Sequence, residues 1–387
     1  MLKSRVSAFL VALTLVACSS GGDTGSSGVG FGQFKDSNTQ GLNYVSGDLS
    51  GVTLADGSFE FVVGGTVTFS VGGVELGTTG GKSVVTPVDL VTRGSSSSPA
   101  VQNIVRFLMT LDSNGDPSDG ITISPKVQAA AVDWQSVAFD GGSFQTALNT
   151  SLEAANAADP DNAANRIIRD AVAAQNHLES TLLCSYAGAY EGTFSGGDRG
   201  SFGILVDATS GEVRGMAYSD IEQISLELTG DSPITFDQNA SFVSGNISSG
   251  ATFSGQFDSV NGLSGTWENT LYGDGGSYSG SRIGGAADAQ YRFTGTFSSD
   301  ASSSTEGLIT LDINSANEVT GQVYDSVDDV LSSLSGSVSG TALTATVAGS
   351  VSVTGTLDRD AGTLSGTWTD DEAGESGDFT GSGCRLN

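Results

Sequence analysis

Cysteine offers the most varied chemistry of any residue type in this sequence, and the chain has three: Cys18, Cys184 and Cys384. Cys18 follows an N-terminal apolar run, so its setting differs from that of the other two. No C-x-x-C pair occurs, which argues against a dithiol redox site. Cys184 and Cys384 remain as an even pair, and in an exported chain such a pair predicts a disulfide. Two buried thiols are the alternative.

A second candidate for chemistry is the segment LDSNGDPSDGI (111–121), which has oxygen-bearing side chains at alternate positions. In calcium loops, side chains at the first, third and fifth positions direct their oxygens toward the bound cation. Pro117 stands where an EF-hand requires glycine, and Ile123 where it requires the closing glutamate, so an ordinary EF-hand is excluded. A shorter Ca²⁺ loop is the remaining hypothesis, and a polar turn that ends a helix is the alternative. The candidate Ca²⁺ ligands are Asp112, Asn114, Asp116 and Asp119.

Residues for catalysis are scarce. His177 is the only histidine, and no G-x-S-x-G sequence occurs, so a Ser-His-Asp hydrolase is not indicated. Zinc hydrolysis normally needs more than one His or Cys ligand. The 44 acidic residues supply carboxylate pairs by accident, and no spacing singles one out. We therefore predict that the protein is not an enzyme and that His177 has a structural or solvent-facing role.

Charge and composition narrow the class of partner. The chain has 15 Lys+Arg against 44 Asp+Glu, for a net charge of −29. A surface this acidic offers few cations to displace the counterions of a nucleic acid, so nucleic-acid binding is excluded, whereas Ca²⁺ and other cations would be attracted. Solubility in a salty environment explains the same charge. Gly is abundant (55) and Pro rare (6), which favours short twisted strands and tight turns.

The N-terminal residues have the pattern of a targeting signal. Residues 1–17, MLKSRVSAFLVALTLVA, begin with two basic residues and continue with an apolar stretch of about ten residues, too short to span a bilayer as a helix. This is the pattern of a secretory signal peptide. The sequence LVAC (15–18) then resembles the lipobox of bacterial lipoproteins. That resemblance implies lipidation of Cys18, cleavage just before it and acylation of the new amino group.

Two or three acyl chains would anchor the protein stably. Ser19 follows the cysteine, and in lipoproteins the absence of Asp there implies transfer to the outer membrane. Residues 18–33 are rich in Gly and Ser and predict a flexible tether of roughly 20–24 Å. The predicted location is therefore the outer membrane through a lipid anchor. The sequence leaves both orientations open, outward or into the periplasm.

Residues 34–95 are predicted to form a small β-sandwich-like module. TVTFSV (66–71) alternates apolar and polar residues, and Asp56-Gly57 is a turn signal. The T-x-x-D-G-x-F pattern at 53–59 resembles modules of the carboxypeptidase-regulatory, transthyretin-like kind, which usually act as spacers or adhesion elements.

Residues 96–184 are predicted to be helical. Ser98-Pro99 and Ser124-Pro125 are helix-start signals, and apolar residues over 101–111 recur at helical spacing. The run 161–184 contains neither Gly nor Pro and predicts one long helix. Its predicted core residues are Ile168, Val172, Leu178 and Leu182.

From residue 185 the sequence repeats with a period of about 100 residues. YEGTFSG (190–196) matches FTGTFSS (293–299), LSGTWEN (263–269) matches LSGTWTD (364–370), and three further matches keep the same order. Short alternating strands joined by tight turns predict an antiparallel meander, closed as one barrel or two.

The predicted fold is thus mainly β, with a small N-terminal β module, a central helical segment and a β domain at 185–387 built from repeats 185–286 and 287–387. Trp267 and Trp368 occupy equivalent positions and are predicted core residues. The segment 224–236 has no counterpart in the second repeat, and an inserted hairpin is one interpretation of it.

The layout resembles uncharacterised surface lipoproteins of Gram-negative bacteria, which combine a small β module, a helical segment and a Gly-rich β domain. FLMTLDSNGDPSDGI (107–121) carries that resemblance. The lipid anchor and Gly-punctuated strands also resemble, distantly, lipoproteins in which a handle domain and a β-barrel capture ligands. Both resemblances imply an architecture and leave the ligand unnamed.

Three functional hypotheses follow. The first is a lipid-anchored protein without catalysis that serves in binding, adhesion or envelope structure, with a protein, glycan or small-molecule partner. The second is a lipocalin-like barrel for a small or apolar ligand, which predicts a connected apolar cavity inside the repeat region. The third is an envelope hydrolase, which predicts a cleft with two close carboxylates, at least one of them desolvated.

Overall fold

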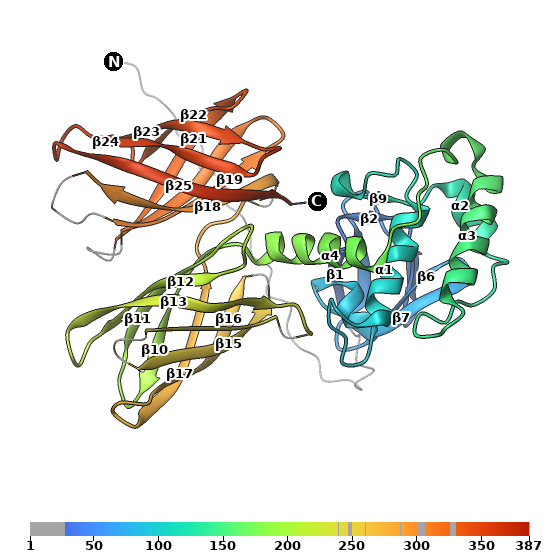
Figure 1. Ribbon diagram of the computed structural model, residues 1–387, viewed down its shortest axis with the longest axis horizontal. Coiled ribbons are helices and arrows are strands. Elements are labelled where there is room, and N and C mark those ends of the chain that lie inside the picture. Colours follow the sequence, from blue (N-terminus) through green and yellow to red (C-terminus); the bar gives the residue numbers. More distant parts are fainter. Residues whose placement is uncertain are drawn as a thin grey trace, which may run out of the picture.

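The computed structural model describes residues 28–386 except 239, 247–249, 260, 287, 301–305 and 326–329. An N-terminal unit of strands and helices lies beside two β-barrels (Figure 1). The predicted signal peptide, 1–17, and Cys18 lie outside the described residues. No helix in the described part of the chain is long and apolar enough to cross a bilayer.

The N-terminal unit contains two small sheets with strand orders β5-β1-β8 and β4-β3-β6-β7, and a two-stranded pair β2-β9. The alternation predicted for TVTFSV is observed, because Val67, Phe69 and Val71 are fully buried. The strands are β1 (Val29–Phe34), β2 (Thr39–Gln40), β3 (Asn43–Ser46), β4 (Leu49–Val52), β5 (Ser58–Val62), β6 (Thr66–Val71), β7 (Val74–Gly80), β8 (Val84–Val85) and β9 (Ile121–Thr122).

The predicted tether, 18–33, is only partly outside the structure. Residues 18–27 are not described, whereas residues from Val29 onward form β1 and pair with β5. Pairing with a neighbouring strand satisfies the backbone of this Gly-containing segment, which its local composition does not reveal.

Helices pack against these sheets. Their bounds are α1 (Pro99–Leu111), α2 (Pro125–Ala131), α3 (Phe144–Ala158) and α4 (Ala171–Tyr186). Helices α1 and α2 begin at the predicted Ser-Pro signals, with Ser98 and Ser124 as N-caps. One hydrophobic cluster includes buried residues of both the strands and the helices, so the two predicted segments share a core.

The prediction of one helix over 161–184 was wrong. Helix α4 begins only after Asp170, whose carboxylate accepts a hydrogen bond from a first-turn N–H (2.8 Å). Before it, the chain turns so that Arg166 forms a buried ion pair with Asp159 (2.9 Å) and donates to the carbonyl of the same residue (3.1 Å). This tertiary pairing outweighs the helix propensity of the intervening residues.

The later start of α4 also changes one predicted core position. Leu178 and Leu182 are buried, and Ile168 packs partly buried against the same core. Val172 lies in the first turn of the shortened helix and is 66% exposed.

The repeat region forms two closed barrels rather than one. The first contains β10 (Gly188–Gly196), β11 (Gly200–Val206), β12 (Val213–Ser219), β13 (Ile224–Thr235), β14 (Ser241–Asn246), β15 (Ala251–Ser259), β16 (Gly262–Asn269) and β17 (Asp274–Arg282). The second contains β18 (Ala289–Ser299), β19 (Glu306–Asn314), β20 (Glu318–Asp325), β21 (Val330–Ser339), β22 (Ala342–Val347), β23 (Val351–Asp358), β24 (Thr363–Asp370) and β25 (Glu375–Arg385).

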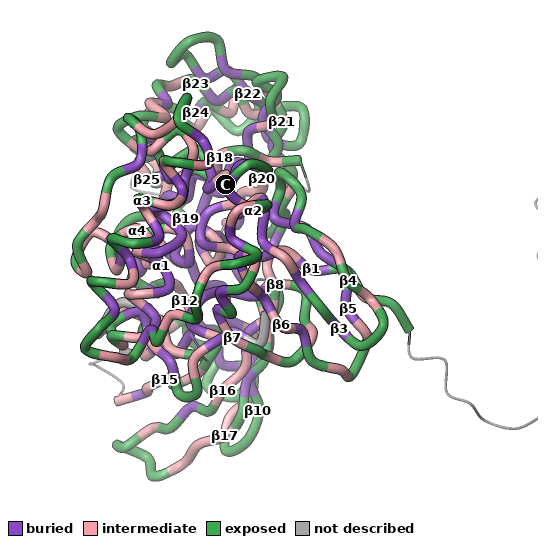
Figure 2. The backbone as a smooth tube through the Cα atoms, turned by 90° about the vertical axis from the view of Figure 1, so that its right-hand side faces the viewer, coloured by how far each residue is buried: buried purple, intermediate pink, exposed green. Residues whose placement is uncertain are grey.

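Each barrel closes by pairing its first strand with its last, β10 with β17 and β18 with β25, both antiparallel. Along most of these strands buried residues alternate with less buried ones, so one face of the strand lines a barrel interior. Strands β11 and β19 are buried on both faces, because Leu205 of the first barrel packs in one cluster with Leu308 and Tyr324 of the second. Figure 2 shows buried segments running through the barrels and the N-terminal unit, while the connecting turns are exposed.

The segment 224–236 is not an inserted hairpin. It forms the single long strand β13 and the start of its connection to β14. That connection contacts the N-terminal unit: the carbonyl of Phe236 accepts from Ser96 N (2.8 Å), and Gln238 donates to the carbonyl of Val91 (3.0 Å). Strand β13 has a counterpart in the second barrel, β21, so the prediction that 224–236 is unmatched was wrong. The connection that follows β13 docks the first barrel on the N-terminal unit.

A single helix end joins all three parts. Cys184, near the end of α4, forms a disulfide with Cys384 in β25. Arg282, at the end of β17, donates to the carbonyls of Ser185 and Ala187 just beyond that cysteine. The second barrel is thus held at the end that carries the C-terminus, and its other end points away from the N-terminal unit (Figure 1).

The disulfide closes a loop with a sequence separation of 200 residues, so removing it should destabilise the protein by up to about 5 kcal/mol on the chain-entropy model. We expect Cys184→Ser/Cys384→Ser to unfold at lower urea concentration than the oxidised wild type, as followed by tryptophan fluorescence. Reductant should lower the wild-type midpoint and leave that of the variant unchanged. Equal midpoints for the two oxidised proteins would contradict the expectation.

Candidate functional site

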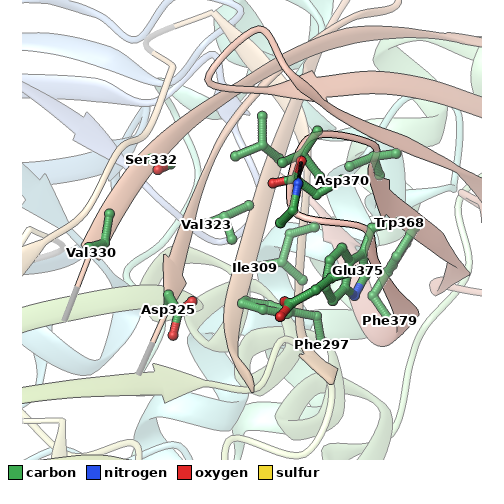
Figure 3. A pocket seen from close by; sticks show the side chains of 14 residues that line it. Phe297, Ile309, Val323, Asp325, Val330, Ser332, Trp368, Asp370, Glu375 and Phe379 are labelled. Atoms are coloured by element: carbon green, nitrogen blue, oxygen red, sulfur yellow. Dashed lines mark hydrogen bonds between the residues drawn. The ribbon is translucent and has the colours of Figure 1, made fainter. Parts of the chain in front are cut away.

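The candidate site is a cavity of about 400 Å³ inside the second barrel, within the range of roughly 300–1,000 Å³ that small-molecule sites occupy. It opens at the end where β18 leads to β19 and β24 leads to β25, opposite the end that carries Cys384. The lining is mostly apolar (Figure 3). Its apolar side chains are Phe297, Ile309, Val323, Val330, Val347, Val351, Val353, Trp368, Ala373 and Phe379.

The repeat explains why this barrel has space inside. Strand registers make Ile309 equivalent to Phe202 of the first barrel, and Val353 equivalent to Phe253. In the first barrel the rings of Phe202, Phe253 and Tyr278 contact one another, with centroids 5.3–6.4 Å apart. Branched aliphatic side chains do not extend to the barrel axis as a phenyl ring does, so their replacement of two rings leaves the centre of the second barrel open.

The exposed fractions of some equivalent side chains also differ between the two barrels. Phe194 and Ala217 of the first barrel are 5% and 2% exposed. Their equivalents in the second barrel, Phe297 and Val323, are only partly buried. Solvent therefore reaches Phe297 and Val323, whereas Ile309 and Val353 are as buried (2% and 3% exposed) as the rings that they replace.

Trp368 has two roles in this cavity. It is 8% exposed, in agreement with the predicted core position, and its indole N–H donates to the carbonyl of Ser298 (3.3 Å). Trp267 makes the equivalent bond to Ser195 in the first barrel (3.1 Å). The bond fixes the ring orientation, so in the second barrel Trp368 presents a rigid aromatic wall to the cavity.

Polar groups line the cavity where it opens. They are the carboxylates of Asp325, Asp370 and Glu375 and the hydroxyl of Ser332. The described residues that line the cavity include no Lys, Arg or His. A ligand here would meet an apolar interior below an acidic opening.

The candidate calcium residues lie together in one loop after α1, and their polar atoms bond within it. The amide nitrogen of Asn114 donates to both Asp119 oxygens (3.0 Å each). Asp116 accepts from the backbone N–H and hydroxyl of Ser118, and those hydrogen bonds lower its pKa. Asp112 accepts a backbone N–H from β9 (2.9 Å). Within the described ranges, no three His, Cys, Asp or Glu side chains are grouped to hold a metal, so the calcium site stays a prediction.

His177 does not form a catalytic triad. Its Nε2 lies 3.5 Å from Ser37 Oγ and 3.4 Å from Asp36 Oδ1. A triad needs the base to use one ring nitrogen for the nucleophile and the other for the acid, whereas here one nitrogen faces both groups. Burial lowers the pKa of His177 to about 4 and raises the pKa of Asp36 to about 8.

Comparison with known proteins gives no family. No family model and no curated protein matches the chain. The chain is similar to solved structures of transferrin binding protein B from serogroup B Neisseria meningitidis (10% identity, 49% of this chain and 53% of that one, TM-score 0.21) and of a protein named surface lipoprotein (11%, 51% and 99%, 0.20). A DUF3598-family protein of unknown function from Nostoc punctiforme is also similar (12%, 54% and 98%, 0.20).

The chain thus spans about half the length of that transferrin binding protein B structure. Similarity at these TM-scores carries no argument about ligand or activity, and the case for the site rests on its own geometry.

Sequence reasoning missed the residues that open the cavity, Ile309 and Val353. The signal was present in the repeat, as a difference in side-chain size between matched segments such as ATFSGQFD and VSVTGTLD. Reading it required knowing which positions face inward and which strands meet across the barrel.

The buried pair of Asp36 and His177 predicts how the stability of the protein depends on pH. A carboxyl whose folded-state pKa is raised to about 8 stabilises the fold fully below its unfolded pKa of 3.8, and that contribution is lost as the pH rises toward 8. His177 acts in the opposite sense, because its lowered pKa contributes stability that is lost as the pH falls from 6.5 toward 4. The histidine is present in both proteins, so we expect Asp36→Asn to gain in Tm relative to wild type by a few degrees between about pH 5 and pH 8.5. A Tm difference independent of pH would contradict this.

Proposed function

We propose that this protein is a lipid-anchored outer-membrane lipoprotein without catalysis, whose second barrel binds a small ligand with an apolar body. The observation that carries the proposal is the cavity of about 400 Å³ in that barrel. Burial of an apolar ligand against its lining would provide the main driving force for binding. The cavity favours the hypothesis of a lipocalin-like barrel over a purely adhesive or structural role.

The placement of the cavity agrees with a carrier or capture role. The predicted anchor at Cys18 leads into the N-terminal unit through β1. The lining residues Asp370 and Glu375 place the opening of the cavity at the β24–β25 end of the second barrel. That end of the barrel points away from the N-terminal unit (Figure 1). With the N-terminal unit nearest the lipid, the opening is available to a ligand in the aqueous phase.

Filling the cavity should abolish binding. We expect Ile309→Phe/Val353→Phe, which restores the rings of the first barrel, to lose the fluorescence enhancement that the neutral apolar probe N-phenyl-1-naphthylamine shows with wild type. About a tenfold or greater loss of affinity is expected, because the rings occupy the space that the probe needs. Titration of the probe at constant protein concentration measures this.

The matched control is Phe202→Ile/Phe253→Val, which makes the reverse change in the first barrel. It should leave the affinity of the second-barrel site unchanged, although it can create an additional site. Thermal unfolding of both variants checks that they fold. A folded cavity-filling variant that binds the probe as tightly as wild type would show that the cavity is not the site.

The lipid anchor has its own test. We expect Cys18→Ala to abolish incorporation of radiolabelled palmitate, because the proposed acyl chains are attached to Cys18. Without those chains the protein should move from the outer-membrane fraction to a soluble fraction. Cys184→Ser/Cys384→Ser serves as a control that changes two cysteines and should retain the label. Labelling of Cys18→Ala at the wild-type level would contradict the proposed anchor.

A further inference from the structure

Three carboxylates meet at the opening of the cavity from different strands. Asp325 ends β20, Asp370 ends β24 and Glu375 begins β25, and all three line the cavity. The equivalent positions of the first barrel are occupied by Ser219, Asn269 and Asp274. The second barrel therefore carries two more acidic residues at this opening than the first.

The arginines of the second barrel lie at its other end. The arginines in residues 288–386 are Arg292, Arg359 and Arg385, and no lysine follows residue 126. Arg292 pairs with Asp312 (2.8 Å), and the guanidinium groups of Arg359 and Arg385 lie 5.3 and 6.0 Å from the ring centroid of Tyr291. These groups are at the opposite end of the barrel, whereas Arg214 of the first barrel lines a neighbouring pocket with Phe297 and Glu306. The charge at the opening is therefore judged from the described lining of the cavity, which has three carboxylates and no Lys, Arg or His.

The interior of the cavity is suited to the apolar part of a positively charged ligand. Branched aliphatic side chains form much of the lining, and Phe297, Trp368 and Phe379 add aromatic surface. An ammonium group is attracted to the faces of aromatic rings, most strongly to tryptophan. A carboxylate or phosphate group would have no cationic partner among the described lining residues and would be repelled by the three acids.

We propose that the ligand of this cavity is an organic cation, with an alkyl or aryl body in the barrel and an ammonium group at the acidic opening. This inference rests on the proposed function, because it names the chemical class of ligand for the same cavity. The apolar body provides affinity, and the carboxylates select the sign of the charge.

Competition between ligands that share one alkyl chain tests the charge separately from the cavity. Octyltrimethylammonium, octanol and octanoate each displace N-phenyl-1-naphthylamine from wild-type protein if the cavity binds octyl chains. We expect the ammonium to compete best and octanoate worst, with about a tenfold or greater difference between the two ions, since partly exposed charge pairs each contribute a factor of about two to five. Raising the ionic strength toward about 0.5 M should narrow that difference and leave octanol unchanged.

Asp370 and Asp358 provide a matched pair of variants. Each accepts two backbone N–H groups within the turn that follows it: Asp370 from residues 372 and 373, and Asp358 from residues 360 and 361. Substitution by Asn keeps an accepting oxygen and removes one charge. Asp370→Asn should weaken octyltrimethylammonium about two- to fivefold without affecting octanol, whereas Asp358→Asn, at the far end, should change neither.

The outcomes separate the two proposals. Octanoate binding as tightly as octyltrimethylammonium, or equal effects of Asp370→Asn and Asp358→Asn, would overturn the charge inference and leave the apolar cavity standing. Failure of the probe and of all three octyl compounds to bind would overturn the proposed function itself.

Discussion

Closure of each eight-stranded sheet is the constraint on which this structure depends. Once the first strand pairs with the last, the circumference is fixed, and the wall has no free edge. The interior volume is then fixed too, so the size and reach of inward-facing side chains decide whether the barrel is filled. Glycines maintain the tight wall: a Cβ on Gly366 would lie 2.3 Å from the carbonyl oxygen of Thr354 on the adjacent strand.

Two barrels with matched strands can therefore differ in what they contain. Rings pack across the first barrel, whereas Ile309 and Val353 leave the second open beside the rigid indole of Trp368. The wall hydrogen bonds do not depend on these side chains, because they join backbone groups. A closed wall of this kind can carry a filled core or a ligand cavity with the same topology.

Three of the few cationic side chains lie at internal contacts. Arg166 pairs with Asp159 before α4, Arg292 with Asp312 in the second barrel, and Arg282 holds the carbonyls at the end of α4. Since these arginines serve the fold, the acidic side chains keep an excess elsewhere on the surface. The large negative net charge of the sequence thus becomes, at the opening of the second barrel, a local preference for the charge of a ligand.

The sequence alone determined the β repeat, the Ser-Pro helix starts of α1 and α2, and the pairing of Cys184 with Cys384, since only two cysteines followed Cys18. Local patterns suffice for such features because each depends on neighbouring residues or on a simple count. The tertiary structure decided the rest. A buried Arg166–Asp159 pair shortened the helix expected over 161–184, pairing with β12 and β14 made most of the segment 224–236 a barrel strand, and contacts across the closed barrel determined which apolar side chains meet. These outcomes depend on residues far apart in the chain, and no local pattern records how far a side chain must reach to fill a space.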